Sequence, residues 1–379
     1  MTETLMRFDP VDTLFFRDAR PYRQGDTSQS GVVSCFPPGP STLVGAVRAA
    51  YARAMGWNGR GSWDTEVTSQ LGDGESLAGI RFRGPFLLES EEPLFPAPAS
   101  LVGKPASDPQ ESAPDPLTLL APGKTRHCDL GPSVRLPEPQ EPSTDLKAPV
   151  DWWLTREGFE HVLHGTKPES KHFRHKSRLW HLEPRVGIER DRDTRTTGEG
   201  AMYSPVHVRL VSDVGIGILV DGLPEKPGNE GDGQLKVRVE ARPQPVGGES
   251  RMCWLSHVPM ITWLPQMPDL PSIESERPRY AVHVVTPLSL EQNGPLESGG
   301  EVPGLPGHLV SACLHRPHLW GGWDSVRRKP VPAKPHVPPG SVLFMEADSN
   351  EDPQLRNLQG SAIGSRTSWG FGVIAIGSW

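Results

Sequence analysis

Short apolar runs alternate with glycine- and proline-rich stretches along most of this chain. Apolar runs of about four to eight residues between turn-forming residues are typical of strands buried in a sheet. The last run, Val373–Ile376, is predicted as a strand that holds the preceding loop of glycine, arginine and aromatic residues at 364–372. The other predicted strands are Leu5–Phe16, Ala78–Leu88, Pro93–Val102, Val206–Leu210 paired with Gly215–Val220, Leu235–Ala241, Met252–Leu255, Tyr280–Leu288 and Ser341–Ala347.

The clearest helical pattern follows the proline-rich stretch 36–40, where Ser41 or Thr42 is predicted to cap the helix N-terminus. Its apolar residues recur at helical spacing at Leu43, Val47, Ala50, Tyr51 and Ala54. A glycine at position 45 weakens a helix, so Gly45 indicates close packing or the approach of a ligand. A second helix start is predicted at 152–153.

The 379 residues are enough for two domains, and we place the boundary in the charged, glycine-containing linker 224–233. The predicted domains are therefore residues 1–222 and 223–379. Residues 103–150 contain ten prolines and are predicted to form an irregular, peripheral insertion. Because short strands outnumber helices, the predicted fold class is α+β with antiparallel sheets.

The charges are distributed unevenly. The formal net charge of −7 argues against nonspecific nucleic-acid binding, which usually needs a basic protein. Residues 164–195 nevertheless hold nine Lys or Arg against five Asp or Glu, whereas residues 64–116 hold ten acids and three bases. This basic segment on an otherwise acidic body either grips an anion or is a solvated charged loop. The alternating charges at 190–195 suit the tip of a long basic hairpin, which we place at 164–200.

The sequence points to a cytoplasmic protein with no membrane contact. No apolar run approaches the roughly 18 residues of a membrane span, and the first 14 residues lack the basic start of a secretion signal. The four cysteines form no CxxC pair and are expected to be reduced and mostly buried.

The sequence contains no familiar enzyme motif and predicts no catalytic residue, metal or cofactor. GxSxG, SxxK, HExxH, the GxxxxGK[ST] phosphate loop and GxGxxG after a strand are all absent. Two histidine pairs have a spacing of three, namely His161 with His164 and His172 with His175. A zinc-supported scaffold is an alternative, but zinc would need further ligands such as His181 or Cys128, and this spacing matches no familiar zinc site.

Several residues are suited to binding RNA. Arg17 and Arg20 follow the first predicted strand, Ser41 marks a helix N-terminus, and Arg251 and Arg366 lie in glycine-rich turns. Guanidinium groups and the N–H groups at helix N-termini bind phosphates. The flat side chains that could stack on bases are Phe36, Trp369 and Phe371.

The same segments resemble a known family, the third subunit of the Cmr effector complex, which is a type III-B CRISPR RAMP protein. The resemblance rests on short motifs in both halves of the chain and breaks over the proline-rich insertion and the linkers. These motifs are Pro10–Pro21, Phe36–Arg48, Leu94–Pro98, Arg185–Arg192, Gly198–Tyr203, Gly247–Arg251, Gly322–Asp324, Lys329–Pro330, Pro339–Val342 and Gly370–Gly372.

The resemblance implies two ferredoxin-like, RRM-like RAMP domains with glycine-rich loops and a protruding hairpin. It also implies a noncatalytic subunit that binds the repeat-derived 5′ tag of the guide RNA and lies close to the target RNA. Its implied protein partners are the large polymerase-like subunit and the backbone subunit of the filament. The positions that match family motifs, with the arginines as expected phosphate ligands, are Arg17, Arg20, Ser41, Thr42, Gly45, Arg48, Gly187, Arg190, Arg192, Gly247, Gly248, Arg251, Arg366, Gly370 and Gly372.

An enzyme is the rival interpretation. A RAMP-type endoribonuclease could cut CRISPR repeat RNA with His172 or His175 as general acid or base.

Overall fold

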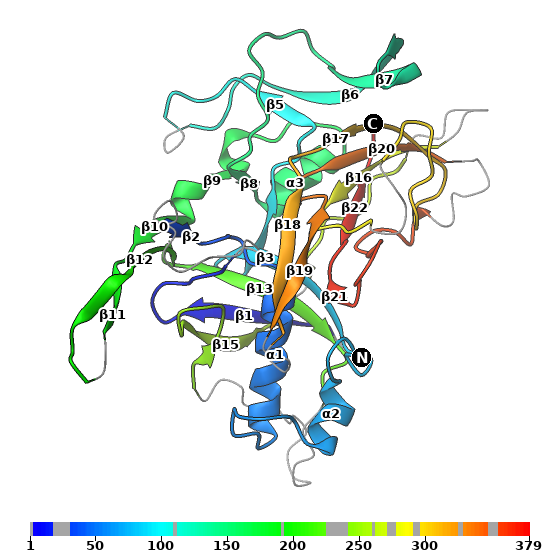
Figure 1. The fold of residues 1–379 in the computed structure, drawn as a ribbon. Coiled ribbons are helices and arrows are strands. Elements are labelled where there is room, and N and C mark those ends of the chain that lie inside the picture. Colours follow the sequence, from blue (N-terminus) through cyan, green and yellow to red (C-terminus); the bar gives the residue numbers. More distant parts are fainter. Residues whose placement is uncertain are drawn as a thin grey trace.

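The computed structural model describes residues 3–17, 31–108, 112–190, 193–224, 242–259, 262–270, 278–290, 296–324, 329–347 and 355–379. These residues form mostly antiparallel sheets with few helices, which confirms the predicted α+β class (Figure 1). No helix in the described part of the chain is long and apolar enough to cross a membrane.

The largest sheet has nine strands, in the order β14-β15-β1-β13-β3-β4-β8-β9, and β21 also pairs with β3. Only the pairing of β21 with β3 is parallel within it. The strands are β1 (Thr4–Pro10), β3 (Arg81–Glu89), β4 (Glu92–Pro96), β8 (Trp152–Leu154), β9 (Phe173–His175), β13 (Val214–Asp221), β14 (Gln244–Pro245), β15 (Met252–Val258) and β21 (Trp369–Gly370).

A second sheet has the order β17-β20-β16-β22. Its strands are β16 (Arg279–Val284), β17 (His308–Cys313), β20 (Val342–Glu346) and β22 (Ile374–Gly377). In chain order, the first strand, β16, lies between the fourth, β22, and the third, β20. The second strand, β17, lies on the outer side of β20. The strands β15-β1-β13-β3 of the large sheet follow the same order. A division at 222/223 would therefore separate β15 from the sheet that it completes.

Alternating side chains place a separate core on each face of the large sheet. Met6 and Phe8 of β1 pack with α1 (Pro40–Ala54) in one core, while Leu5 faces the other. That second core also contains Ala375 of β22 and Phe159 of α3 (Arg156–Leu163), so it joins the two sheets. A third core fills the other face of the second sheet.

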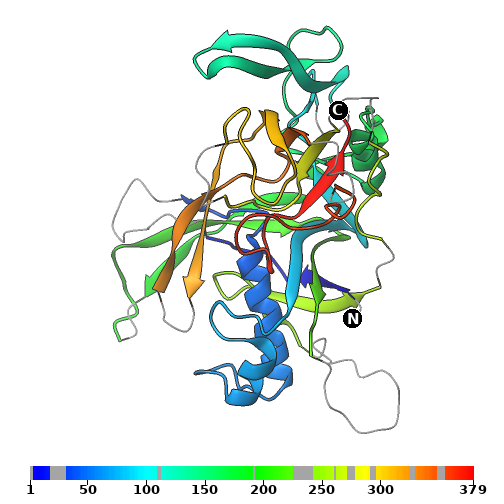
Figure 2. The same cartoon turned by 90° about the vertical axis from the view of Figure 1, so that its right-hand side faces the viewer.

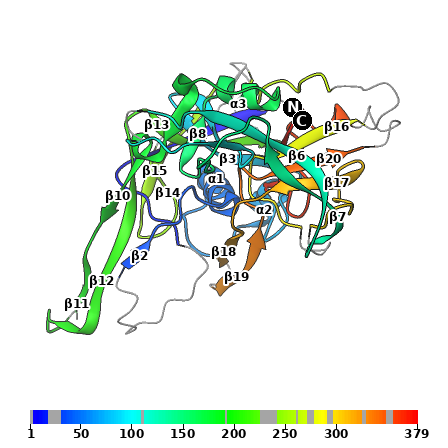
Figure 3. The same cartoon turned by 90° about the horizontal axis from the view of Figure 1, so that it is seen from above.

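The protruding hairpin is shorter than predicted. It consists of β10 (Trp180–Pro184), β11 (Gly187–Arg190) and β12 (Thr197–Leu210), with β2 (Gly31–Val33) added parallel to β12, and it projects away from the body (Figure 3). Residues 164–179 lie outside it: 164–169 follow α3, and 170–178 form β9 and two short 3-10 turns. The predicted pairing of Val206–Leu210 with Gly215–Val220 is wrong, since β12 and β13 belong to different sheets.

The prediction of an irregular insertion is also wrong. Strands β5 (Leu101–Gly103), β6 (Leu117–Cys128) and β7 (Gly131–Pro139) form a three-stranded sheet at one end of the molecule (Figures 1 and 2). The Glu346 carboxylate of β20 links this sheet to the second sheet, because it lies 3.6 Å from the Arg135 guanidinium and 3.1 Å from that of Arg279.

Further elements differ from or complete the prediction. The strand β1 ends at Pro10, before the predicted end at Phe16, and residues 152–154 form a strand where a helix start was expected. A short helix, α2 (Thr65–Leu71), follows α1, and a separate hairpin is made by β18 (His318–Asp324) and β19 (Lys329–His336). The predicted strand 235–241 lies outside the described residues.

Two glycines provide a test of this backbone. Gly372 has a φ of +71°, and a Cβ there would overlap the carbonyl oxygen of Ile363, whereas Gly45 is exposed and a Cβ would meet nothing. We expect Gly372→Ala to lower the free energy of unfolding by more than about 1 kcal/mol. Gly45→Ala should raise it by about 0.5–1 kcal/mol because alanine favours helix. Urea unfolding measures both, and a stable Gly372→Ala variant would contradict the described turn.

Candidate nucleic-acid interface

The segment Asp12–Arg17 connects β1 to the region where most of the predicted RNA ligands lie. Leu14 exchanges two backbone hydrogen bonds with Val208 of β12, with N–O distances of 2.7 and 2.9 Å. The Phe15 carbonyl accepts from Gly248 N at 2.8 Å, and the Phe16 carbonyl accepts from Cys35 N at 2.8 Å. The segment is therefore held on both sides, and it ends at the exposed Arg17.

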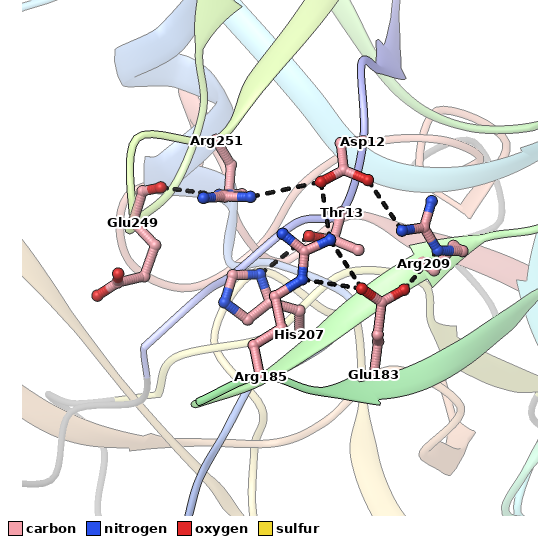
Figure 4. Close-up of polar contacts among 8 residues, drawn as sticks. All are labelled: Asp12, Thr13, Glu183, Arg185, His207, Arg209, Glu249 and Arg251. Atoms are coloured by element: carbon pink, nitrogen blue, oxygen red, sulfur yellow. Dashed lines mark hydrogen bonds and ion pairs between the residues drawn. The ribbon is translucent and has the colours of Figure 1, made fainter. Parts of the chain in front are cut away.

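The Asp12 carboxylate anchors the start of this segment through three arginines (Figure 4). Arg185 and Arg209 each donate to one of its oxygens at 2.8 Å, and Arg251 lies 3.5 Å away. Glu183 accepts from the Nε atoms of Arg185 and Arg209 at 2.8 and 2.5 Å. The pKa of Asp12 is lowered to about 2, chiefly by the hydrogen bond from Arg185; burial opposes this shift, and the hydrogen bond from Arg209 adds to it.

The turn that carries Gly247 and Gly248 is shaped by contact with this segment. Gly247 has a φ of +76°, and a Cβ there would overlap the carbonyl oxygen of Phe15. Arg251 is engaged by Asp12 and also donates to the Glu249 carbonyl at 2.7 Å. Within this chain, these predicted RNA ligands hold the Asp12–Arg17 segment in place.

A recess lies at the N-terminus of α1, and we call it the α1 recess. It is lined by Phe16, Arg17, Cys35, Gly39, Ser41, Thr42, Leu319, Trp320, Gly321, Gly322 and Phe371. The helix cap is Gly39, with Pro40 in the first turn, so the prediction of Ser41 or Thr42 as the cap is wrong. The Ser41 hydroxyl is a buried polar atom that has no hydrogen-bond partner among the described residues.

The β18–β19 hairpin forms one wall of this recess. The Trp320 ring lies over Gly39 so closely that a Cβ there would be 2.8 Å from the ring. His318 Nε2 lies 3.1 Å from Cys35 Sγ, and the His336 ring lies 5.3 Å from that of Phe371. Sequence analysis missed this wall, although the pair Gly321–Gly322 in an apolar run was a usable signal.

The α1 recess is suited to an anion. The first N–H groups of a helix lack intrahelical partners, and the helix dipole places partial positive charge there. Arg17 adds a guanidinium, and the glycine backbone at 321–322 can approach a ligand without interference from side chains. Pro40 has no N–H group and Thr42 N donates to the Gly39 carbonyl at 3.1 Å, so the helix N-terminus offers the N–H of Ser41 beside the Arg17 guanidinium.

The chain matches the family model described as CRISPR-associated protein (Cas_Cmr3) over residues 6–379. The chain belongs to the Cmr3 family. This confirms the family resemblance seen in the sequence.

Solved structures resemble this Cmr3-family chain at low sequence identity. A chain of the type III-B Cmr-beta complex bound to cognate target RNA and AMPPnP is 16% identical, with 90% of this chain and 86% of that chain covered and a TM-score of 0.45. A chain of the same complex bound to cognate target RNA is 14% identical, with 94% of this chain and 89% of that chain covered and a TM-score of 0.46. A chain of the Csm3–Csm4 subcomplex of a type III-A complex is 12% identical, with 91% of this chain and 97% of that chain covered and a TM-score of 0.38. No curated protein matches the chain.

In the Cmr3-family chain the C-terminal glycine loop borders the α1 recess. The Arg366 guanidinium lies 4.5 Å from the Trp369 ring centroid and 5.5 Å from that of Phe371, and it is 3.2 Å from Glu75. Trp369 and Phe371 are buried in the core, so neither is available to stack on a base as predicted. Gly370 and Gly372 have positive φ and touch neighbouring backbone.

Arg48 is placed in the interior. Its guanidinium donates to the carbonyls of Leu71, Gly74 and Ser76 at 3.0 to 3.4 Å, and its side chain also lies against the Trp63 ring. The prediction that Arg48 contacts a phosphate is therefore wrong, because its N–H groups are hydrogen-bonded at and just after the C-terminal end of α2.

The remaining predicted ligands are dispersed. Gly187 pairs with Tyr203 and Arg190 with Thr197 on the protruding hairpin, and neither Gly187 nor Arg190 lines the α1 recess. Arg20 and Arg192 lie outside the described residues. The structure therefore brings Arg17, Ser41 and Thr42 together in the α1 recess, whereas Arg366 does not line the recess and stacks on Phe371, which does.

The histidines of the two rival interpretations are packed among protein groups. His172 is buried, and burial lowers its pKa. His175 Nδ1 lies 2.8 Å from the Ser177 hydroxyl. Among the described residues, no three His, Cys, Asp or Glu side chains form a group that could hold a metal ion.

The low pKa of Asp12 predicts a pH dependence. A carboxyl whose pKa falls from 3.8 to about 2 on folding stabilises the protein above pH 4, and this contribution is lost as the pH falls towards 2. Because the side chain is 44% exposed, we expect only about 1 kcal/mol. Asp12→Asn should lower the free energy of unfolding by about this amount at pH 7 and by progressively less below pH 4. Equal losses at pH 7 and pH 2.5 in urea unfolding would contradict the ion-pair origin.

Proposed function

We propose that this Cmr3-family chain is a noncatalytic RNA-binding subunit of a type III-B CRISPR effector complex that holds the 5′ tag of the guide RNA. The observation that carries the proposal is the α1 recess, where Arg17, the helix N-terminus and the glycine backbone at 321–322 converge. RNA is the expected ligand because a CRISPR-associated protein family is matched over almost the whole chain.

The proposed RNA contact depends on a few donors, without a broad basic surface. The chain is acidic overall, with a formal net charge of −7, so long-range attraction to RNA is weak. A small number of phosphate contacts gives weak, salt-sensitive binding. We therefore propose that the free subunit binds RNA weakly and that the guide is held tightly only in the assembled complex.

The proposed complex has two further partners, the large polymerase-like subunit and the backbone subunit of the filament. We infer that two ferredoxin-like RAMP domains mediate this assembly. The repeated strand order in β15-β1-β13-β3 and β22-β16-β20-β17 supports this inference. In this arrangement the first domain includes β15, beyond the predicted boundary at 222.

Arg17 offers the direct test of the proposed RNA contact. Arg17→Ala should weaken binding of single-stranded RNA to a similar extent for all sequences, because a guanidinium that contacts phosphate reads no base. The slope of log affinity against log salt should become shallower by about 0.7, which corresponds to one phosphate contact. Fluorescence anisotropy with labelled repeat RNA over a salt series measures both effects.

Arg126→Ala is the matched control, because Arg126 is exposed, ion-paired with Glu138, and located on the three-stranded β5–β6–β7 sheet. It should leave the affinity and salt slope unchanged. Equal effects of Arg17→Ala and Arg126→Ala would sink the proposed contact. Arg366→Ala should also weaken tag protection in the assembled complex.

The noncatalytic role is tested with repeat RNA. We expect purified protein to leave it intact, because the His172 ring is buried and His175 is hydrogen-bonded to Ser177. A gel that resolves cleavage products is the measurement. Cleavage that His172→Ala or His175→Ala abolishes would replace this role with the endoribonuclease alternative.

A further inference from the structure

The β18–β19 hairpin has two faces of different character. Successive residues of a strand point to opposite faces, so in β18 Trp320 points to one face and Leu319, Gly321 and Trp323 point to the other. The register with β19 shifts between Trp320 and Gly322, where β19 has one extra residue. The Trp320 face is packed against the body at Gly39. The opposite face, which we call the Trp323 face, is left without a partner in the described structure.

The Trp323 face is apolar and exposed. The Trp323 side chain is 62% exposed and Leu319 is 52% exposed. Across the hairpin, Leu319 is opposite Pro335 and Trp323 is opposite Pro330, and both prolines are also exposed. A cluster of exposed large apolar side chains on a two-stranded hairpin marks a binding surface, because it gains nothing from folding alone.

The Trp323 face adjoins the α1 recess. Leu319 and Gly321 of the Trp323 face line that recess together with Trp320 and Gly322 of the opposite face, while Trp323 lies beyond its lining. Gly321 leaves a gap between Leu319 and Trp323, whose Cα atoms are about 13 Å apart in an extended strand. The α1 recess therefore borders the apolar Trp323 face at Leu319.

This combination matches the chemistry of one ligand class. A single-stranded nucleotide carries an anionic phosphate and, a few ångströms away, a flat base that stacks on aromatic side chains. A duplex would not fit, since its bases are already stacked and hidden. A purely apolar protein surface would not explain the neighbouring Arg17 and helix N-terminus.

We propose that Trp323 stacks on an unpaired RNA base whose backbone is held in the α1 recess. This inference rests on the proposed RNA-binding function and deepens it by assigning a base contact to the β18–β19 hairpin. Stacking tolerates all four bases, so Trp323 contributes affinity and fixes the position of the strand.

The test uses the full-length protein at low ionic strength and a labelled single-stranded RNA of about eight nucleotides. Trp323→Ala should weaken binding between about fivefold and a hundredfold, and Trp323→Phe should retain most of the affinity. A second RNA of the same length with abasic sites keeps the phosphates and removes the bases. On that RNA, wild type and Trp323→Ala should bind equally.

Trp254→Ala is the matched control, since Trp254 is 46% exposed on β15 and does not line the recess. It should bind both RNAs like wild type. Unchanged affinity in Trp323→Ala, or an equal loss on the abasic RNA, overturns the stacking contact while the effect of Arg17→Ala still supports RNA binding. If wild-type protein binds neither RNA, the proposed function fails together with this inference.

Discussion

The proposed RNA-facing side depends on the ion pairs that the Asp12 carboxylate forms. This carboxylate joins Arg185, Arg209 and Arg251, which come from three separate segments of the chain. A single exposed ion pair stabilises a protein little, but here Glu183 binds two of the same guanidinium groups and completes a network. The network fixes the start of the Asp12–Arg17 segment. Backbone hydrogen bonds of Leu14, Phe15 and Phe16 fix the rest of the segment as far as Arg17, which lines the α1 recess.

Glycines set the distances between the elements around this segment. Gly247 lets a turn approach the Phe15 carbonyl, and Gly39 lets Trp320 cover the start of α1. Any side chain at either position would push the neighbouring element away. Glycine-rich motifs that resemble ligand cradles in the sequence therefore serve first to bring protein segments together, and the α1 recess is a product of that close packing.

The sequence predicted the strand-rich α+β class and most individual strands, because short apolar runs report burial directly. It did not predict which strands pair. β12 and β13 are separated by three residues yet lie in different sheets, and the prolines of 103–150 concealed strands β6 and β7. Arg48 was wrongly predicted to face a phosphate for a related reason. The carbonyls of residues 71, 74 and 76, which accept its hydrogen bonds, come together only in the folded chain.

Charge counting along the sequence does not show which cations are paired within the protein. The excess of cations at 164–195 is largely balanced within the protein, because Lys167 binds Glu141, Arg174 binds Glu89 and Lys176 binds Asp151. Cations with such partners add little to the field that a distant phosphate experiences. The α1 recess has fewer charges, but its helix N-terminus and Arg17 act at short range. The number of cations in a segment therefore overstates the charge that the segment can offer to a ligand.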